Sequence, residues 1–295
     1  MATYLITRRT ILRHMLLRPD RPMNQILVYL LAVMANHHGL RLHAFCAMSD
    51  HIHLVVTDER GTLPDFLQPF HRTVALCTRG LRRWKEVVWD KSPTSVVRLE
   101  TQAAVVEKIA YVLANPVAAG LVRHAHEWPG AKVLVDEIGQ GTLRAGRPKV
   151  YLNPKKWPAE SELPISLPPG VEPAEAGAFR LQVATEVAHL EARAHAEMAE
   201  QRRSILGADR ARAVSPTSRA TTPEPKFDRN PTFAVGRDQG EARSRAAAAV
   251  RAFRVAYQAA IEQWCAGIRS IVFPAGTWLM RTFHRAAVAD IAVAV

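Results

Sequence analysis

Two histidines separated by one residue lie inside an apolar run of the sequence. His51 and His53 flank Ile52, and three aliphatic residues follow at 54–56. This composition predicts a β-strand, in which residues two apart lie on one face about 7 Å from each other. Two neutral imidazoles on one face are suitable ligands for a metal ion. The alternative interpretation is two hydrogen-bonded, half-exposed histidines without a metal.

A second pair of polar residues occurs in a segment with helical spacing. Tyr111 and Asn115 are four residues apart and therefore share a helix face. The amide oxygen of Asn115 could supply a third ligand beside the phenol of Tyr111. The alternative is an amphipathic tyrosine at the core boundary and an asparagine beside the helix break at Pro116. The residues alone leave both interpretations open.

A further His-x-His pattern occurs at His124 and His126. These two histidines follow the predicted end of a helix, and no strand pattern surrounds them. We therefore expect them to lie on the surface.

The elements that would position these residues follow from periodicity and turn signals. Strands are expected at 4–9, 40–48, 51–57 and 95–99, and helices at 23–36, 63–84 and 101–120. The order β-α-β-β-α-β, followed by a helix, predicts an α+β, ferredoxin-like split βαβ sandwich. We expect an antiparallel sheet with helices on one face, and the two histidines on the opposite face.

The rest of the chain is expected to be mainly helical. Residues 1–135 would form the domain that carries the candidate site. The pattern predicts a proline-rich and helical extension at 136–206, a flexible linker at 207–240 and a helical segment at 241–295. Within the extension, the helix is expected at about 175–206.

The charge of the chain favours a polyanionic partner. Lys and Arg number 39 against 27 Asp and Glu, a net charge of +12. A basic surface attracts nucleic acid, although a merely solvated surface is the alternative. The candidate contacts are Arg8, Arg9, Arg13, Arg79, Arg82, Arg83, Trp84 and Lys85. The run at 79–85 could instead complement the dipole of a helix C-terminus, and His71 is a weaker candidate.

The cysteines and apolar segments indicate a cytoplasmic location. Only three cysteines occur, with no CxxC pair, which fits a reducing compartment. The longest apolar stretch, at 26–35, is too short to cross a bilayer, so no membrane partner is expected.

Residues 4 to about 135 resemble the REP-associated tyrosine transposases, which are single-tyrosine members of the HUH endonuclease superfamily. The resemblance is carried by "MSDHIHLVV" and by "YVLANPVAAGLV". The first stretch matches the family's His-hydrophobe-His strand, and the second matches its helix with a tyrosine and an amide residue four later. "FPAGTWLMR" near the end also resembles longer members. One departure is Asp50, where the family usually has asparagine.

The resemblance implies a transposase that nicks and joins single-stranded or hairpin DNA through a 5′-phosphotyrosine. Tyr111 would be the catalytic nucleophile, and His51, His53 and Asn115 would bind Mg²⁺ or Mn²⁺. The location would be cytoplasmic and nucleoid-associated, and the resemblance leaves monomer or homodimer open. A phenol with its usual pKa near 10 is a poor nucleophile unless a cation or base assists it.

Three alternatives to this function stay open. One is a nucleotide hydrolase of the histidine-triad kind, which needs a third histidine where this chain has Val55. Another is a non-catalytic DNA-binding protein derived from a transposase. The third is a protein that binds hairpin RNA.

Overall fold

The computed structural model of the protein describes residues 1–222 and 231–290. Four antiparallel strands and two helices form its central unit. In chain order these are β1 (Ala2–Arg9), α1 (Arg21–His38), β2 (Leu40–Ala47), β3 (His51–Asp58), α2 (Leu63–Arg82) and β4 (Ser95–Leu99). The strands lie in the order β2-β3-β1-β4, which is the ferredoxin-like arrangement predicted from the sequence.

Side-chain alternation along the strands divides the sheet into two faces. In the register of β1 with β3, Thr7 lies opposite His53 and Arg8 lies opposite Ile52. Because residues opposite each other point to the same side, Thr7 and His53 share one face. Arg8 and Ile52 share the other.

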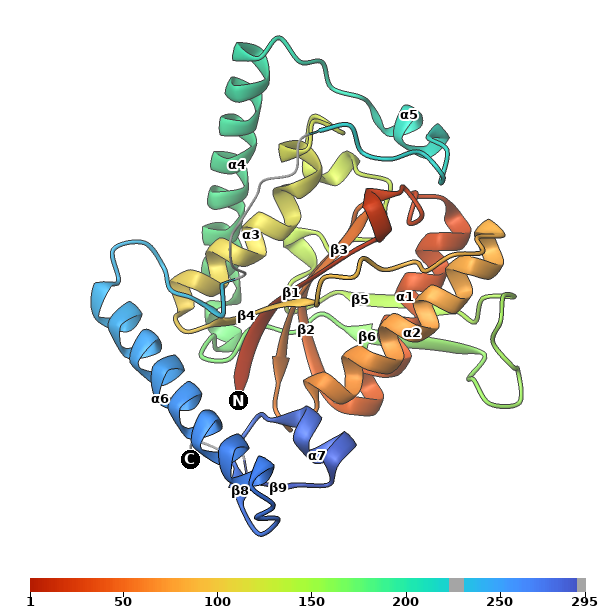
Figure 1. Cartoon of the computed structure of the whole chain (residues 1–295). Coiled ribbons are helices and arrows are strands. Elements are labelled where there is room, and N and C mark those ends of the chain that lie inside the picture. The colour runs from red at the N-terminus through yellow and green to blue at the C-terminus, as the bar shows by residue number, and fades with distance from the viewer. Residues whose placement is uncertain (223–230, 291–295) are drawn as a thin grey trace.

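Helices cover both faces of the sheet: the two crossover helices lie on one face, as predicted for the split βαβ unit, and a later helix covers the other. The two crossover helices α1 and α2 pack on the Arg8 face, where Arg8 lies over Trp89 and the Trp89 indole donates to the carbonyl of His71 in α2. The next helix, α3 (Gln102–Ala118), covers the opposite face, where Tyr111 contacts His53. Figure 1 shows α3 and α1 on opposite sides of the strands.

Helix ends are fixed by short polar side chains. Asp20 accepts a hydrogen bond from the Met23 amide at the start of α1, and Gly39 ends that helix with φ 68°. The Asp58 carboxylate accepts hydrogen bonds from the amides of Thr62 and Leu63 where α2 begins. These caps set where each helix leaves the sheet.

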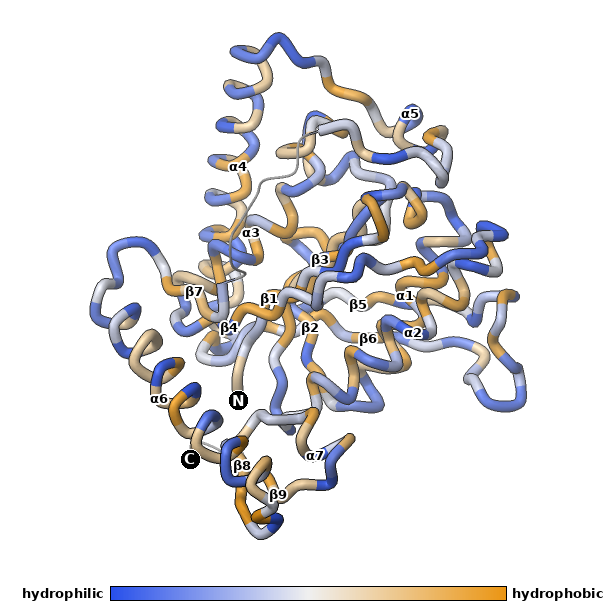
Figure 2. Tube along the Cα trace, viewed as in Figure 1, coloured by the Kyte–Doolittle hydropathy of each residue, from blue (hydrophilic) through white to orange (hydrophobic). Residues whose placement is uncertain are grey.

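Residues after 120 extend the same core. The hairpin β5 (Thr142–Gly146) and β6 (Glu160–Pro164) packs on α1, and α4 (Ala176–Glu200) packs along α3. One core cluster runs from Leu5 to Ala211, and hydrophobic residues concentrate around the central strands (Figure 2). A domain boundary at 135 therefore stays a prediction, because packing continues across it.

The segment at 207–240, predicted to be a flexible linker, contains a short helix and a short strand among its described residues. It contains α5 (Ala208–Ala213) and β7 (Phe233–Ala234), which adds to β4 as a parallel edge strand. Residues 223–230 of this segment lie outside the described residues.

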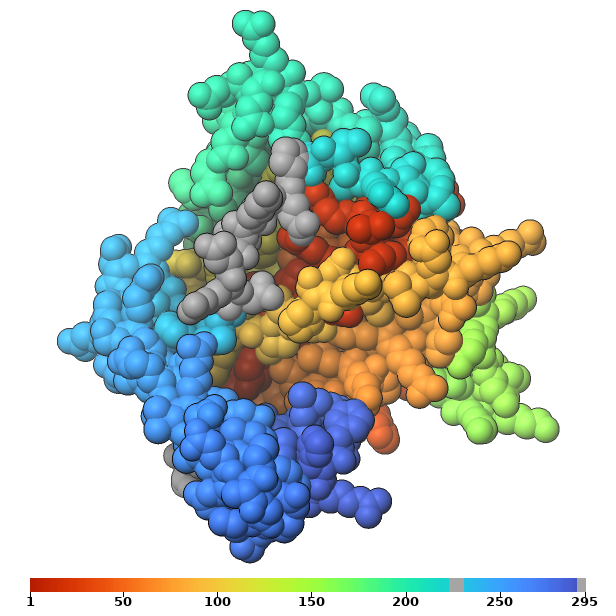
Figure 3. All heavy atoms as spheres, in the orientation of Figure 1, coloured from red at the N-terminus to blue at the C-terminus, as the bar shows by residue number. Residues whose placement is uncertain are grey.

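The C-terminal residues form a small module with its own core. Its elements are α6 (Gly240–Cys265), β8 (Val272–Phe273), α7 (Trp278–His284) and β9 (Ala287–Val288). Phe273 is the fully buried centre of this core. The Asp65 carboxylate of α2 accepts hydrogen bonds from the side chains of Trp278 and Arg281 and so connects the module to the central unit. Figure 3 shows this module in blue at the periphery of the molecule.

Short 3₁₀ turns occur at Ile11–Arg13, Ala125–Glu127, Val135–Glu137 and Pro173–Glu175.

Membrane-spanning helices are absent from the described part of the chain: none of its helices combines the required length and apolar character.

Candidate active site

The structure places His51 and His53 side by side at the start of β3. Their ring centroids are 4.7 Å apart. His53 is only 2% exposed, and the His51 side chain is 17% exposed. Because α3 covers this face, the two rings lie beneath a helix and not on an open sheet surface.

His51 is held between a carboxylate and an amide. Its Nδ1 lies 2.7 Å from Asp50 Oδ1, and its Nε2 lies 3.3 Å from Asn115 Oδ1. An ionised carboxylate only accepts hydrogen bonds, so Nδ1 carries a proton. In the neutral ring, the Nε2 lone pair then faces the Asn115 oxygen. Two acceptors in this arrangement need a proton or a cation between them.

Asp50 is ionised in this setting. Its Oδ2 accepts a hydrogen bond from Arg13 Nε at 3.1 Å. Burial acts to raise the pKa of Asp50, but the hydrogen bond and charge of His51 and the pairing with Arg13 outweigh it and lower that pKa. A carboxylate in this position fixes the orientation of the imidazole that it contacts.

His53 presents an unsatisfied nitrogen. Its Nδ1 lies 2.8 Å from Thr7 Oγ1, whereas its buried Nε2 has no hydrogen-bond partner. Burial, followed by the charges of His51 and Arg9, lowers the pKa of His53 well below its usual value. The ring is therefore neutral, and in the tautomer in which Nδ1 donates to the Thr7 hydroxyl, Nε2 carries a lone pair. A buried lone pair without a partner fits a metal ligand.

Few side chains near the rings of His51 and His53 could act as further metal ligands. Within the described residues, no group of three or more His, Cys, Asp or Glu side chains is arranged to hold a metal. A site built on His51 and His53 must therefore take its third ligand from another residue type, and the oxygen of Asn115 is in contact with His51. Two nitrogens and one amide oxygen suit Mn²⁺, and Mg²⁺ is acceptable with water as a further ligand.

Tyr111 lies on the same helix face as Asn115 and contacts His53. The two ring centroids are 5.3 Å apart, and Tyr111 is 41% exposed. Burial raises the pKa of the Tyr111 phenol, while the charge of Arg9 and an interaction with Asn115 act to lower it. The net shift is upward, so the phenol is protonated near neutral pH.

The predicted nucleic-acid contacts in β1 and the turn that follows it divide into two groups. Arg9 lies opposite His51 on the site face, and its charge acts on His53 and Tyr111. Arg8 lies on the other face and donates to the carbonyls of Asp90 and Ser92. The structure thus separates Arg8 from the site. Arg13 contacts Asp50 and Thr222.

The basic run at the end of α2 is partly structural. The Arg82 side chain is 7% exposed and donates to the Leu16 carbonyl and to Asp20. The Trp84 ring contacts the His14 ring in a tilted arrangement, with ring centroids 4.9 Å apart. Arg79 bonds to carbonyls of the following turn, while the Arg83 and Lys85 side chains are exposed. These contacts favour a scaffold role for Arg82 and leave the exposed cations as the candidate DNA contacts.

Two contacts of the site were not expected from the sequence. Thr7 contacts His53, and Arg13 contacts Asp50. Thr7 could have been found by pairing the first predicted strand with the His-x-His strand. Nothing in the local sequence indicates the contact between Arg13 and Asp50, because it depends on a turn that the pattern does not specify.

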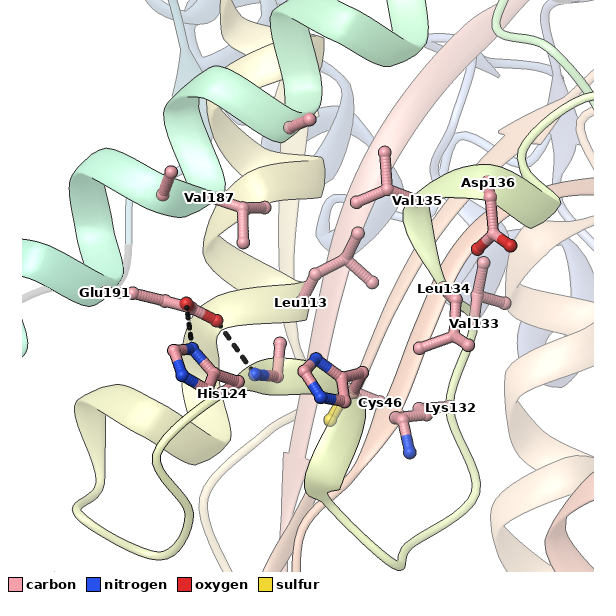
Figure 4. A pocket seen from close by; sticks show the side chains of 14 residues that line it. Cys46, Leu113, His124, Lys132, Val133, Leu134, Val135, Asp136, Val187 and Glu191 are labelled. Atoms are coloured by element: carbon pink, nitrogen blue, oxygen red, sulfur yellow. Dashed lines mark hydrogen bonds and ion pairs between the residues drawn. The ribbon is translucent and has the colours of Figure 1, made fainter.

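A separate cavity lies between α3 and α4 and does not include the candidate residues. Its volume is about 320 Å³, and Leu113, Val135 and Val187 line it. Figure 4 shows Glu191 at one side of it, where its carboxylate binds His124 and the amide of Ala125. The second His-x-His pair is thus at the rim of an apolar cavity, away from Tyr111.

Comparisons with known proteins give distant structural likenesses only. No protein-family model and no curated protein sequence matches this chain. A solved REP-associated tyrosine transposase bound to a REP hairpin is similar over 46% of this chain and 78% of its own, with 14% identity and a TM-score of 0.39. A crystal structure of a putative transposase from Deinococcus radiodurans R1 is similar over 33% and 78%, with 23% identity and a TM-score of 0.28.

Proposed function

We propose that this protein is a metal-dependent enzyme that nicks and joins single-stranded DNA, with Tyr111 as its nucleophile. One observation supports this proposal above all. His51 Nε2 lies 3.3 Å from the amide oxygen of Asn115, the His53 ring contacts the rings of His51 and Tyr111, and the buried His53 Nε2 lacks a partner. A cation site next to a phenol on a basic protein fits phosphoryl transfer to tyrosine.

The residues that would hold the metal are His51, His53 and Asn115. When bound there, Mg²⁺ or Mn²⁺ would neutralise the charge that develops on the phosphate oxygens. The protein's own contribution is to orient both imidazoles. Asp50 and Thr7 do this through the Nδ1 atoms.

Tyr111 would attack the scissile phosphorus through its phenolic oxygen. A bond forms between that oxygen and phosphorus, and the bond to the 3′-oxygen of the neighbouring nucleotide breaks. The phenol proton passes to solvent, and the leaving 3′-oxygen takes a proton from solvent. The products are a 5′-phosphotyrosine and a free 3′-hydroxyl. A different 3′-hydroxyl can reverse the step, which gives strand transfer without an external energy source. The positive charge of Arg9 favours the phenolate and opposes the effect of burial.

The substrate proposed is single-stranded DNA, folded as a hairpin. The net charge of +12 supports a polyanion. The exposed Arg83 and Lys85 side chains are candidates for phosphate contacts. Single strands are held by such cations together with stacking side chains.

The test is a covalent-adduct assay with labelled single-stranded hairpins and Mn²⁺ or Mg²⁺. We expect a protein–DNA species on a denaturing gel that chelation abolishes. Tyr111→Phe should remove it while leaving hairpin binding within about twofold. Tyr151→Phe is the matched control, because Tyr151 is an exposed tyrosine outside the site.

Two kinds of result would contradict the proposed function. An adduct of full yield in Tyr111→Phe would exclude this nucleophile. Tight hairpin binding with no adduct under any metal would favour the non-catalytic DNA-binding protein, and preference for a matched RNA hairpin would favour an RNA partner.

A further inference from the structure

The turn after β1 lies beside the site and pairs with a segment that follows it in the chain by more than two hundred positions. Leu12 and Arg13 in this turn have φ values of 47° and 54°, which lie in the left-handed region. Two consecutive non-glycine residues in this region are unfavourable by themselves. Surrounding contacts must therefore hold the turn in place.

Those contacts come from residues 217–220. The Met15 amide donates to the Ser218 carbonyl at 2.9 Å, and the Ala220 amide donates to the Arg13 carbonyl at 3.1 Å. These hydrogen bonds pair the turn with the later segment as a short antiparallel ribbon, which is continued by the bridge between His14 and Arg219.

The side chain of His14 is satisfied by the same segment. Its Nδ1 lies 2.8 Å from the Thr217 carbonyl oxygen, and its Nε2 accepts from Arg219 Nε at 3.1 Å. A carbonyl only accepts, so Nδ1 carries the proton and Nε2 is free to accept. Both ring nitrogens are thus used by residues 217–219, which fixes the turn further.

Arg13 joins the segment to the candidate site. Its two terminal nitrogens donate to the carbonyl and hydroxyl oxygens of Thr222, at 2.7 and 3.1 Å. Its Nε donates to Asp50. Because the guanidinium is a rigid planar fork, anchoring its end on Thr222 aims Nε at the carboxylate.

The segment also touches the other half of the site. The amides of Leu206 and Gly207 donate to the carbonyls of Gly120 and Leu121, both at 2.9 Å, just beyond the end of α3. Residues 206–222 therefore contact both the turn that follows α3, the helix that carries Asn115, and the turn that supports Asp50. Figure 1 shows this part of the chain, with α5, passing from the end of α3 to the turn after β1.

We infer that Asp50 is a positioning residue that holds His51 with Nε2 toward Asn115, and that Arg13 and residues 206–222 hold Asp50 in place. Only the identity of what His51 binds rests on the proposed function. Residues 206–222 would then be required to shape the site.

The test measures the tautomer of His51 directly, by ¹⁵N NMR of the imidazole in the metal-free full-length protein at pH 8. In the wild-type protein we expect the proton on Nδ1. Asp50→Ala should give a mixture of tautomers and lower the Mn²⁺ affinity, measured by calorimetry, by ten- to a hundredfold. Asp50→Asn keeps an accepting oxygen, so it should retain the Nδ1–H form and most of the affinity.

A variant of Arg13 tests whether residues 206–222 hold the Asp50 carboxylate in place. Arg13→Gln should broaden the His51 signals and weaken Mn²⁺ binding by about three- to tenfold, on the order of the lower limit for such supporting residues. Arg41→Gln is the control. Arg41 forms an exposed ion pair with Glu59 and lies at the start of β2, whereas Asp50 lies just after the end of that strand. It should change neither measurement.

An unchanged tautomer and unchanged Mn²⁺ affinity in Asp50→Ala would overturn the inference. If that variant fails to fold, an unchanged tautomer and affinity in Arg13→Gln would contradict the part assigned to Arg13. A tautomer that depends on Asp50 in a protein without Mn²⁺ affinity would support the positioning role and reject the proposed metal site, so the two failures are distinguishable.

Discussion

Individual side chains at the site differ in whether their hydrogen-bonding groups are satisfied. Asp50 and Thr7 satisfy the Nδ1 atoms of His51 and His53, whereas His53 Nε2 is buried without a partner. An unsatisfied buried acceptor is costly and persists where it has a use. The residue scale therefore supports a ligand role for His53 more directly than the His-x-His spacing does.

Replacing His53 should abolish metal binding without unfolding the protein. His53→Gln removes the Nε2 ligand while keeping a polar group near Thr7. We expect the Mn²⁺ affinity, measured by calorimetry, to fall more than tenfold. The free energy of unfolding without metal should change by about 1 kcal/mol or less, because an unsatisfied group is lost.

The second His-x-His pair supplies the control for this prediction. His126→Gln alters an exposed ring with the same sequence spacing and should leave Mn²⁺ affinity unchanged. Equal losses in both variants would contradict a specific site at His53.

Spacing in the sequence was sufficient to bring the two histidines together, and Tyr111 with Asn115. Residues i and i+2 of a strand, or i and i+4 of a helix, share a face whatever the rest of the fold does. The contacts of Thr7 and Arg13 were not predictable in this way. They depend on strand register and on a left-handed turn that a distant segment holds.

At the scale of elements, the strands and helices of residues 1–120 follow the predicted order, and the predicted strand at 95–99 coincides with β4. The two crossover helices lie on one face of the sheet, as expected, and the later helix α3 covers the other face. An apolar stripe on α3 predicts that this helix packs against the core, but it does not predict which face of the sheet the helix covers. The placement of α3 is decisive, because it brings Tyr111 over His53.

The end of α2 separates scaffold from substrate contact. Arg82 is buried and paired with Asp20, so Arg82→Ala should lower the free energy of unfolding by about 2–4 kcal/mol. Arg83→Gln, one position away and exposed, should change stability by less than about 0.5 kcal/mol. Denaturant unfolding of both variants gives the measurement.

The same pair of variants tests the DNA contact. Arg83→Gln should weaken hairpin binding and reduce the salt slope by about one unit. An unaltered slope in Arg83→Gln would assign this cation to the solvated surface. An undiminished stability in Arg82→Ala would contradict its scaffold role.

At the scale of the whole molecule, buried neutral histidines couple the fold to pH. His43 is fully buried, with Nδ1 near the Ser166 carbonyl and Nε2 near the Thr57 hydroxyl. Burial lowers the pKa of His43 to about 4, from the ordinary 6.5. Burial also lowers the pKa of His71, to about 3. Both rings are therefore neutral in the folded protein and protonated in the unfolded chain at acid pH.

Stability should therefore fall as pH decreases from about 6.5 to 4. In this range the unfolded state binds more protons than the folded state, and the contribution of His43 is present above pH 6.5 and lost on acidification. Its full size is about 3 kcal/mol at 1.36 kcal/mol per pKa unit. Urea unfolding at several pH values should show a flatter pH dependence in His43→Gln than in the wild-type protein.

An exposed histidine provides the comparison. His189→Gln on α4 should leave the pH dependence of unfolding as it is in the wild-type protein. If the free energy of unfolding depended on pH equally in the wild-type protein, His43→Gln and His189→Gln, His43 would not be a neutral buried group.

The measurement that tests the central claim most directly is the mass of the covalently modified peptide. After reaction with a single-stranded hairpin and Mn²⁺, the protein is digested with nuclease and protease, and the peptides are sequenced by mass spectrometry. The account predicts a nucleotide 5′-phosphate on Tyr111, in the peptide that begins after Lys108. A nucleotide attached to any other residue, or none where the hairpin has been cleaved, would contradict it.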